Sequence, residues 1–258
     1  MNLERERRSL CPKGIQVELS IYQFDRRKLA RGFAGIGDFP SDKAITIFLK
    51  NSLDPTGRSF YVFIMKAEQP TSSKRADLVE IASELFYAQG YGATGIKQII
   101  DTAGIAKGTF YSHFSSKEEL GVAWLKSRHQ VWNAWLDEGI KDARSAKGKL
   151  IAMFDFLETW MTSCDYRGCA FLNTLAEIPD PEHAMRREIE SHKRDLQSKI
   201  EALVAEHSSG KSDAFNKQRA LIIFLLFEGA IVETQNLRDL SLITAARKEV
   251  KSLLSTSS

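Results

Sequence analysis

Long hydrophobic runs and cysteines are both scarce in this chain of 258 residues. The longest strictly apolar stretch, Ala220–Phe227, is far shorter than the roughly 20 residues that a membrane-spanning helix needs. The three cysteines, Cys11, Cys164 and Cys169, are too few for a disulfide framework and favour a reducing compartment. No apolar segment follows the charged first residues, so no secretory signal is predicted. We therefore expect a cytoplasmic protein with no membrane partner.

The charge of the chain is unevenly distributed. Hydrophobic residues make up 43% and charged residues 27%, as in an ordinary globular protein of one or two domains. The net charge is +3, to which residues 1–64 contribute +4 and residues 65–258 contribute −1. The overall charge is therefore not that of a nucleic-acid binder. Any affinity for DNA must come from a local patch.

Residues 1–70 differ in pattern from the rest of the chain. They contain scattered glycine and proline, the basic cluster Arg26–Lys28 and two strand-like runs at 44–49 and 60–64. Two short strands are too few for an independently stable sheet. We interpret residues 1–70 as an extension that is poorly folded or not translated, with Met65 as an alternative start. A basic arm that contacts DNA or a partner is the alternative.

Helical periodicity begins at residue 72 and continues to the end of the chain. Gly90 and Gly104 end the first two helices, and Ser116 and Glu119 form a capping box that opens a long helix. After the second helix the pattern predicts helices at about 107–114, 117–143, 148–163, 169–178, 182–207, 213–235 and 240–254. We therefore expect an all-α fold with one domain over residues 71–118 and a second over residues 119–258.

Two short helices joined at Gly104 have the pattern of a helix-turn-helix. The second helix of such a unit presents its N-terminal residues to the major groove of DNA, which is wide enough for an α-helix. The candidate contacts are a glycine that permits close backbone approach, three short polar or aromatic side chains and two lysines: Gly108, Thr109, Tyr111, His113, Lys107 and Lys117. Packing under the next helix remains an alternative for His113, and a solvated first-turn position remains one for Lys117.

The segments Gly90–Ile96 (GYGATGI), Ala106–Phe114 (AKGTFYSHF) and Ser116–Leu120 (SKEEL) resemble the DNA-binding domain of TetR-type transcriptional repressors. Residues 166–173 and 226–230 resemble the same family more weakly. The resemblance implies a homodimer with an N-terminal three-helix helix-turn-helix domain and a helical-bundle domain for effector binding and dimerisation. It also implies phosphate contacts at Thr94, Gly95, Tyr111, His113 and Lys117, and approach to the bases at Lys107, Gly108 and Thr109.

The sequence departs from the family pattern at three positions. Ala106 stands where a serine or proline commonly opens the recognition helix, Gly95 stands where a threonine or serine is frequent, and Ile100 stands where a small residue is often found. Gly95 removes a hydroxyl from the N-terminus of its helix. Ala106 removes either the serine hydroxyl or the fixed backbone angle of proline from the N-terminus of the recognition helix. They affect individual contacts and not the expected fold.

Aromatic residues are concentrated on the helices that would surround an effector pocket. An apolar pocket lined by Trp160 and Phe171 fits this placement, and ordinary core packing is the alternative. No cofactor or metal site is expected, because the Cys164–Cys169 spacing matches no ligand pattern and His183 and His192 do not share a helix face. Packing of Cys169 under the preceding loop is the favoured interpretation.

The segment around residues 221–232 is apolar almost all round its helix, so this helix must be buried on several sides. A second subunit can cover one of those sides. The residues expected at the dimer interface are Leu221, Phe224, Leu225, Ile231 and Leu253. A two-fold dimer would match a palindromic operator in double-stranded DNA.

These patterns together predict a bacterial, cytoplasmic, ligand-responsive transcriptional repressor that binds a palindromic operator and is released by a small-molecule effector. An enzyme is not expected, since the sequence contains no nucleophile elbow, phosphate loop or zinc-protease motif. A helical adaptor that has lost DNA binding is a third possibility. The intact segment Lys107–Lys117 argues against it.

Overall fold

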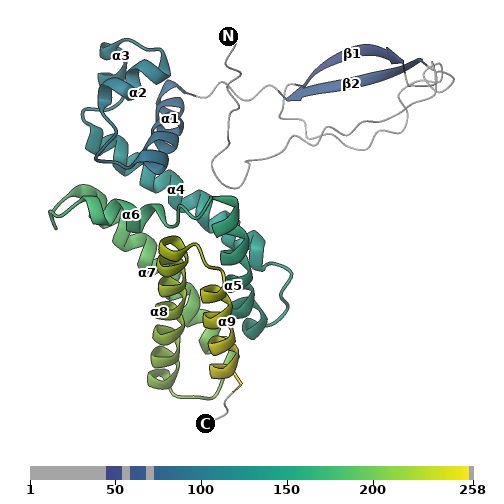
Figure 1. Cartoon of the computed structure of the whole chain (residues 1–258), viewed down its shortest axis with the longest axis vertical. Helices are drawn as coiled ribbons and strands as arrows, with labels where there is room; N and C mark the ends of the chain where they lie inside the picture. The colour runs from purple at the N-terminus through teal and green to yellow at the C-terminus, as the bar shows by residue number, and fades with distance from the viewer. Residues whose placement is uncertain (1–44, 54–58, 68–72, 256–258) are drawn as a thin grey trace. The chain divides into compact units, whose positions relative to one another are not determined.

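The computed structural model describes the backbone of residues 45–53 and 59–67 and all of residues 73–255 (Figure 1). The strands β1 (Ile45–Leu53) and β2 (Ser59–Ala67) form an antiparallel hairpin with Ile45 opposite Ala67 and Leu53 opposite Ser59. The two predicted strands are therefore confirmed and are longer than the sequence pattern indicated. The basic cluster at residues 26–28, which carried the alternative of a DNA-binding arm, lies outside the described residues.

Residues 73–255 are helical, as predicted. The helices are α1 (Lys74–Gln89), α2 (Ile96–Ala103), α3 (Lys107–Tyr111), α4 (Lys117–Ile140), α5 (Ala146–Ser163), α6 (Ala170–Glu177), α7 (Ala184–His207), α8 (Asp213–Leu237) and α9 (Ser241–Leu253). Each predicted helix from residue 72 onward is confirmed, with ends that shift by a few residues.

The predicted helix boundaries rest on local chemistry that the structure reproduces with one change. Gly104 ends α2 in the left-handed region at φ +64°, where its N–H donates to the carbonyls of Asp101 and Ile100. Ser116 opens α4, since its hydroxyl accepts from the Glu119 N–H at 3.0 Å. The Glu119 carboxylate accepts from the backbone N–H and hydroxyl of Ser115, both at 2.8 Å, and not from the Ser116 N–H. The reciprocal half of the capping box is thus displaced by one residue.

Helices α1, α2 and α3 form a head, and α4 leads from it into a body made of α5 to α9 (Figure 1). The head has its own apolar centre, with Leu78, Phe86, Ile99, Phe110 and Phe114 all 2% exposed or less. In the body, α7 packs against α4, α5 and α8, and α9 packs against α5 and α8. The long helix α4 therefore connects both packing units directly.

The helix α8, with 25 residues, contains an 18-residue window that is apolar enough to cross a membrane by length and composition. Its packing against α5, α7 and α9 is what a core helix of a globular protein shows. Only 33% of that window is buried within the chain. Leu221, Leu225, Val232 and Leu237 are between 41% and 61% exposed, so α8 carries an apolar face that this chain alone does not cover.

Candidate DNA-binding head and regulatory core

The helix α3 presents the predicted recognition residues on its outer side. Phe110 is fully buried and fixes α3 to the head, whereas Lys107 and Gly108 are exposed and Tyr111 is 44% exposed. The Lys107 ammonium lies 5.9 Å from the centre of the Tyr111 ring, so the cation and the aromatic side chain share one surface. A Cβ added at Gly108 would meet no other atom within 4 Å. This surface is therefore open to a close approach by another molecule.

The flanking candidates surround the same short helix. Thr109 and His113 are half-buried, and Gly95 is exposed at the N-terminus of α2 with no neighbouring atom near its Cβ position. Neither Gly95 nor Ala106 provides a side-chain cap to the helix that it precedes. The first N–H groups of α2 and α3 are therefore not satisfied by cap side chains. Such groups suit a phosphate.

The side chain of Thr94 has a different role from the predicted one. Thr94 is fully buried, and its hydroxyl donates to the Gly90 carbonyl at 2.7 Å and accepts from the Gln89 amide at 3.0 Å. No part of this side chain faces solvent. The Thr94 hydroxyl therefore stabilises the turn between α1 and α2 and does not face a phosphate, so a contact at Thr94 would have to use the backbone and stays a prediction.

Lys117 also serves that turn. Its ammonium donates to the carbonyls of Tyr91 at 3.0 Å and Thr94 at 3.2 Å, and it lies 4.3 Å from the centre of the Tyr91 ring. Burial lowers the pKa of Lys117, while the charge of Glu177 opposes that effect. Two of the three ammonium donors are engaged inside the protein. Only one N–H of the Lys117 ammonium therefore remains for the predicted phosphate contact.

Glu177, the last residue of α6 in the body, contacts the same turn between α1 and α2. The Glu177 carboxylate accepts from the Gly92 N–H at 2.5 Å. A Cβ at Gly90, whose φ is +102°, would lie 2.9 Å from a Glu177 oxygen, and one at Gly92 would lie 3.0 Å from the other. The two glycines therefore allow Glu177 to reach the turn. A displacement of α6 would act on the start of α2 through this contact.

We expect Glu177→Ala to loosen the α1–α2 turn without unfolding the protein. The substitution removes a hydrogen bond to a charged acceptor, which contributes about 1.5 kcal/mol and thus changes a local opening equilibrium roughly tenfold. Amide hydrogen exchange at residues 90–95 should accelerate accordingly. Glu182→Ala is the matched control, because Glu182 is an exposed acid in the next loop whose carboxylate makes no contact with the head. Equal protection in both variants would exclude this role for Glu177.

The interior of the body contains a ring cluster centred on His192. Its imidazole stacks on Phe171 with centroids 3.7 Å apart, and Trp132 meets it edge-on at 5.0 Å. Burial, together with the nearby charges of Lys193, His129 and Arg128, lowers the pKa of His192 to about 2, so the imidazole is neutral. Its Nδ1 lies 3.1 Å from Nδ1 of His129.

The two residues predicted to line an effector pocket both belong to this aromatic interior. Phe171 is 1% exposed and Trp160 is 2% exposed, with Trp160 packed edge-on against Trp132 at 6.1 Å. A pocket among the described residues lies between α8 and α9, and neither Trp160 nor Phe171 lines it. The ligand-lining roles of Trp160 and Phe171 remain predictions.

A largely buried ion pair next to these rings was not predicted. The Lys193 ammonium lies 2.6 Å from the Glu228 carboxylate and 3.6 Å from the Cys169 sulfur. Burial lowers the pKa of Lys193, but Cys169 and Glu228 raise it by more, so the amine stays charged. Cys169 is a free, buried thiol at the start of α6, as expected from the sequence. Within residues 73–255, no three His, Cys, Asp or Glu side chains are arranged to hold a metal ion.

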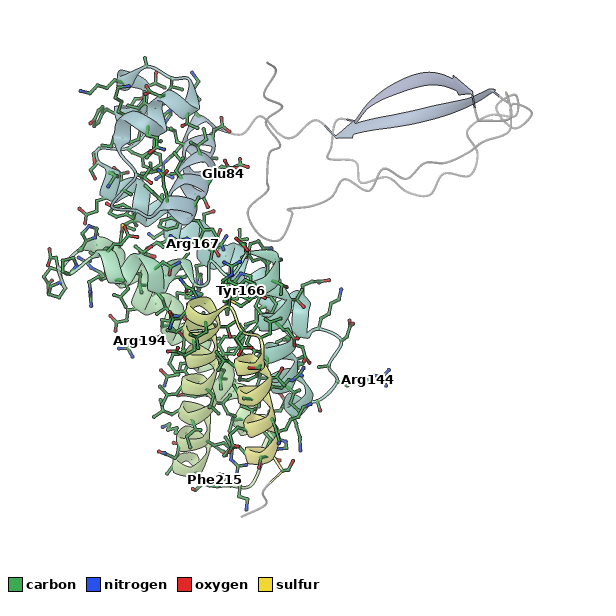
Figure 2. All side chains as sticks on the ribbon, viewed as in Figure 1. Glu84, Arg144, Tyr166, Arg167, Arg194 and Phe215 are labelled. Atoms are coloured by element: carbon green, nitrogen blue, oxygen red, sulfur yellow. The ribbon has the colours of Figure 1, made fainter. Side chains whose placement is uncertain are left out.

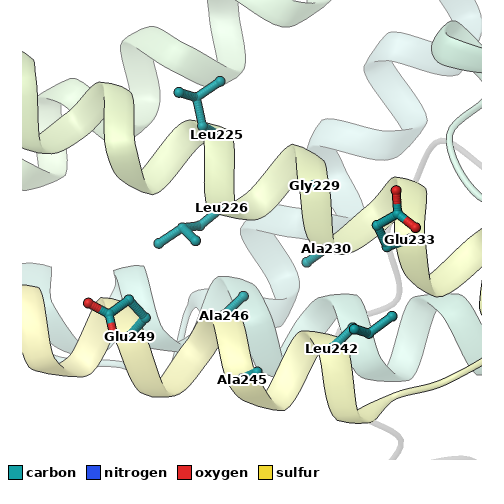
Figure 3. A pocket seen from close by; sticks show the side chains of 9 residues that line it. All are labelled: Leu225, Leu226, Gly229, Ala230, Glu233, Leu242, Ala245, Ala246 and Glu249. Carbon is teal, nitrogen blue, oxygen red and sulfur yellow. The ribbon is translucent and has the colours of Figure 1, made fainter.

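An apolar groove of 360 Å³ runs between α8 and α9 (Figure 3). It is lined by Leu225, Leu226, Gly229, Ala230, Glu233, Leu242, Ala245, Ala246 and Glu249. Leu225 is 60% exposed and Leu221 is 41% exposed, while Phe224 and Leu253 are half-buried. Ile231 is only 1% exposed and packs inside its own chain, so its prediction as an interface residue is wrong.

Comparison with known proteins decides the family. The model named "Bacterial regulatory proteins, tetR family" matches residues 78–123, and "Tetracyclin repressor-like, C-terminal domain" matches residues 146–250. The chain belongs to the TetR family. As a member of that family it is a DNA-binding transcriptional regulator and not an enzyme.

Three relatives illustrate the likeness. The TetR-family regulator SCO4454 from Streptomyces coelicolor has a TM-score of 0.64 and 28% identity, covering 71% of this chain and 90% of its own. The repressor NemR of Escherichia coli is 23% identical over 70% of this chain and 94% of its length. The activator FasR of Mycolicibacterium smegmatis is 39% identical over 34% of this chain and 42% of its length. The curated relatives therefore include both a repressor and an activator.

Proposed function

We propose that this protein is a cytoplasmic homodimeric repressor that binds a palindromic operator and is released by a small-molecule effector. The observation that carries the proposal is the outer surface of α3, where Lys107, Gly108 and Tyr111 are exposed around the buried anchor Phe110. A helix presented in this way fits the major groove. Repression is the activity named for NemR.

A dimer is supported by the apolar face of α8 and the groove beside α9. A soluble monomer rarely leaves several large aliphatic side chains exposed on one helix. A two-fold axis through this face would pair α8 and α9 with the same helices of a second copy. The two α3 helices would then read half-sites about 34 Å apart, which is one turn of DNA.

Release by an effector is supported by the contacts between body and head. An effector bound among the aromatic side chains of the body would act on α6, whose last residue, Glu177, holds the Gly92 N–H. The effector then favours a spacing of the heads that does not fit the operator. Such coupling typically amounts to about 1–3 kcal/mol, or a 5- to 150-fold loss of operator affinity.

The test is binding of the full chain to DNA from upstream of its own gene, measured by fluorescence anisotropy at two salt concentrations beside unrelated DNA. We expect Lys107→Ala to reduce the preference for the upstream DNA about tenfold, because a lost base contact affects one sequence more than another. Tyr111→Ala should weaken binding to both DNAs alike, since phosphate contacts carry no sequence information.

Lys141→Ala is the matched control for these variants, because Lys141 is an exposed lysine at the far end of α4. It removes the same charge and should leave both affinities unchanged. Unaltered operator affinity in the Lys107→Ala, Tyr111→Ala double variant would refute the recognition surface. Equal, strongly salt-dependent binding of the wild-type chain to both DNAs would instead favour an adaptor that binds phosphate without reading sequence.

A further inference from the structure

Arg128 on α4 is a buried cation without an anionic partner among the described residues. Its side chain belongs to a residue that is 7% exposed, and its Nη2 is buried with no hydrogen-bond acceptor. No carboxylate within residues 73–255 forms an ion pair with it. Its contacts are two aromatic faces, those of Tyr87 at 4.5 Å and Trp135 at 5.1 Å.

The groups around Arg128 supply no free carboxylate. The Glu228 carboxylate forms an ion pair with Lys193 at 2.6 Å, and the His192 imidazole is neutral. Tyr87 and Cys169 also lie near the guanidinium, and they oppose the effect of burial on its pKa. Burial lowers the pKa of Arg128, but a guanidinium remains protonated in proteins. The free energy lost when such a charge is removed from water is larger than the free energy gained from two cation–π contacts. The chain thus maintains an unfavourable group at a position where an apolar residue would pack.

We propose that Arg128 binds the anionic group of the effector, and that this effector is an apolar monocarboxylate. The inference rests on the proposed function, because it specifies the ligand of the regulatory body. A guanidinium and a carboxylate form two parallel hydrogen bonds, which would satisfy the orphan Nη2. The rest of the ligand would be apolar, since the rings of Trp132 and Phe171 pack around His192 close by. One unmatched cation suits a single negative charge, not a phosphate dianion.

Entry of the ligand requires a side chain to move. Trp135 covers one face of the guanidinium and is half-buried, so it has the freedom that the fully enclosed neighbours lack. Trp135 lies two helical turns beyond Arg128 on the same face of α4. Outward rotation of the Trp135 ring would expose the guanidinium on the side that this ring now contacts.

The position of Arg128 also connects this site to the head. Tyr87, the other ring that the guanidinium contacts, belongs to α1, and the Tyr87 hydroxyl donates to the Gly168 carbonyl at 2.8 Å. Arg167 Nε in turn donates to the Tyr87 carbonyl at 2.7 Å. Figure 2 shows Tyr166 and Arg167 where the head meets the body. A guanidinium drawn toward a carboxylate would leave the Tyr87 face and disturb a contact between α1 and the loop before α6.

The experiment compares carboxylates with their neutral amides in thermal unfolding of the full chain. The probes are acetate, benzoate and octanoate, paired with acetamide, benzamide and octanamide, and phenyl phosphate tests a dianion. We expect at least one of the apolar carboxylates, benzoate or octanoate, to raise the Tm of the wild type by about 3–6 °C at tenfold excess over its Kd, with no effect of its amide. In Arg128→Met the same carboxylate should bind at least about tenfold more weakly.

Arg144→Met is the matched control, because Arg144 is exposed on the loop after α4 (Figure 2) and should respond to the probes as the wild type does. Without any probe, Arg128→Met should unfold at the same temperature as the wild type or higher. A lower Tm would mean that Arg128 is a structural brace between two rings, and the proposal would be overturned. It would equally be overturned if neither apolar carboxylate outperformed its amide, if the dianion alone bound, or if Arg128→Met kept the effect. Failure of this proposal can be distinguished from failure of the proposed function, because operator binding is measured in a separate assay and neither Arg128 nor Arg144 lies in the head.

Discussion

Leu225→Glu is expected to convert the dimer into monomers and to lower operator affinity at least about 100-fold. Leu225 is 60% exposed on α8 and lines the apolar groove between α8 and α9. In a two-fold dimer the substitution occurs twice in the same interface, where each carboxylate would be buried without a partner. Glu233 and Glu249 already line this groove, so the added charges would also repel them. A monomer retains only one recognition helix and therefore loses half of the operator contacts.

The measurement combines light scattering after size exclusion with anisotropy on the same DNA. Val131→Glu is the control, because Val131 is a 39% exposed aliphatic residue on α4, outside the α8–α9 face. It introduces the same charge on a similarly exposed aliphatic position. We expect Val131→Glu to remain dimeric with unchanged affinity. A Leu225→Glu protein that stays dimeric would show that the dimer interface is elsewhere. A monomeric Leu225→Glu protein with full operator affinity would show that one DNA-binding head is enough.

The helices were predictable because their signals are local. Apolar spacing of three and four residues, Gly104 at a helix end and Ser116 at a helix start each act within one or two turns, and the structure contains all three. The strands of the N-terminal extension were predictable for a similar reason, since β-branched and aromatic residues cluster in two runs. The family pattern in the head also depends on contiguous residues.

The direction of individual polar side chains was not predictable in the same way. Thr94 and Lys117 stand at positions that suggest phosphate contact, but the tertiary fold brings the Gly90, Tyr91 and Thr94 carbonyls within their reach. A hydrogen bond to a buried carbonyl outweighs exposure to solvent, because an unsatisfied buried carbonyl is costly. Spacing along one helix contains no information about such a neighbour.

The polar interior was missed because its members come from different helices. Arg128 is on α4, Cys169 precedes α6, His192 and Lys193 are on α7, and Glu228 is on α8. The spacing between His183 and His192 argues only against a metal site and does not indicate which groups surround His192. One signal was available in the sequence. His192 and Lys193 are three or four residues from the apolar Ile189 and Leu196, so these polar residues lie on the apolar face of α7. That signal shows burial, but the partner becomes visible only when the helices are packed.

The second large effect is expected for the ion pair in this interior. Lys193→Met should lower the free energy of unfolding by about 3 kcal/mol, because it leaves the Glu228 carboxylate without its cation in a largely buried position. The Glu228 side chain is 16% exposed, and its Oε1 already has no hydrogen-bond partner. The remaining carboxylate would have to stay ionised at a high desolvation cost or take up a proton. Either result weakens the packing of α7 against α8.

Urea unfolding at one fixed protein concentration measures this effect, since the stability of a dimer depends on concentration. Arg194→Met, one residue along α7, is the matched control: Arg194 pairs with Glu190 on the surface (Figure 2), with side chains 72% and 61% exposed. An exposed pair contributes less than about 1 kcal/mol. Adding Glu228→Leu to Lys193→Met should recover most of the lost stability, because two apolar side chains need no partner. If Lys193→Met lowers the free energy of unfolding by no more than Arg194→Met does, water must reach the Lys193–Glu228 pair. The interior around Arg128 would then be less isolated from solvent than its burial implies.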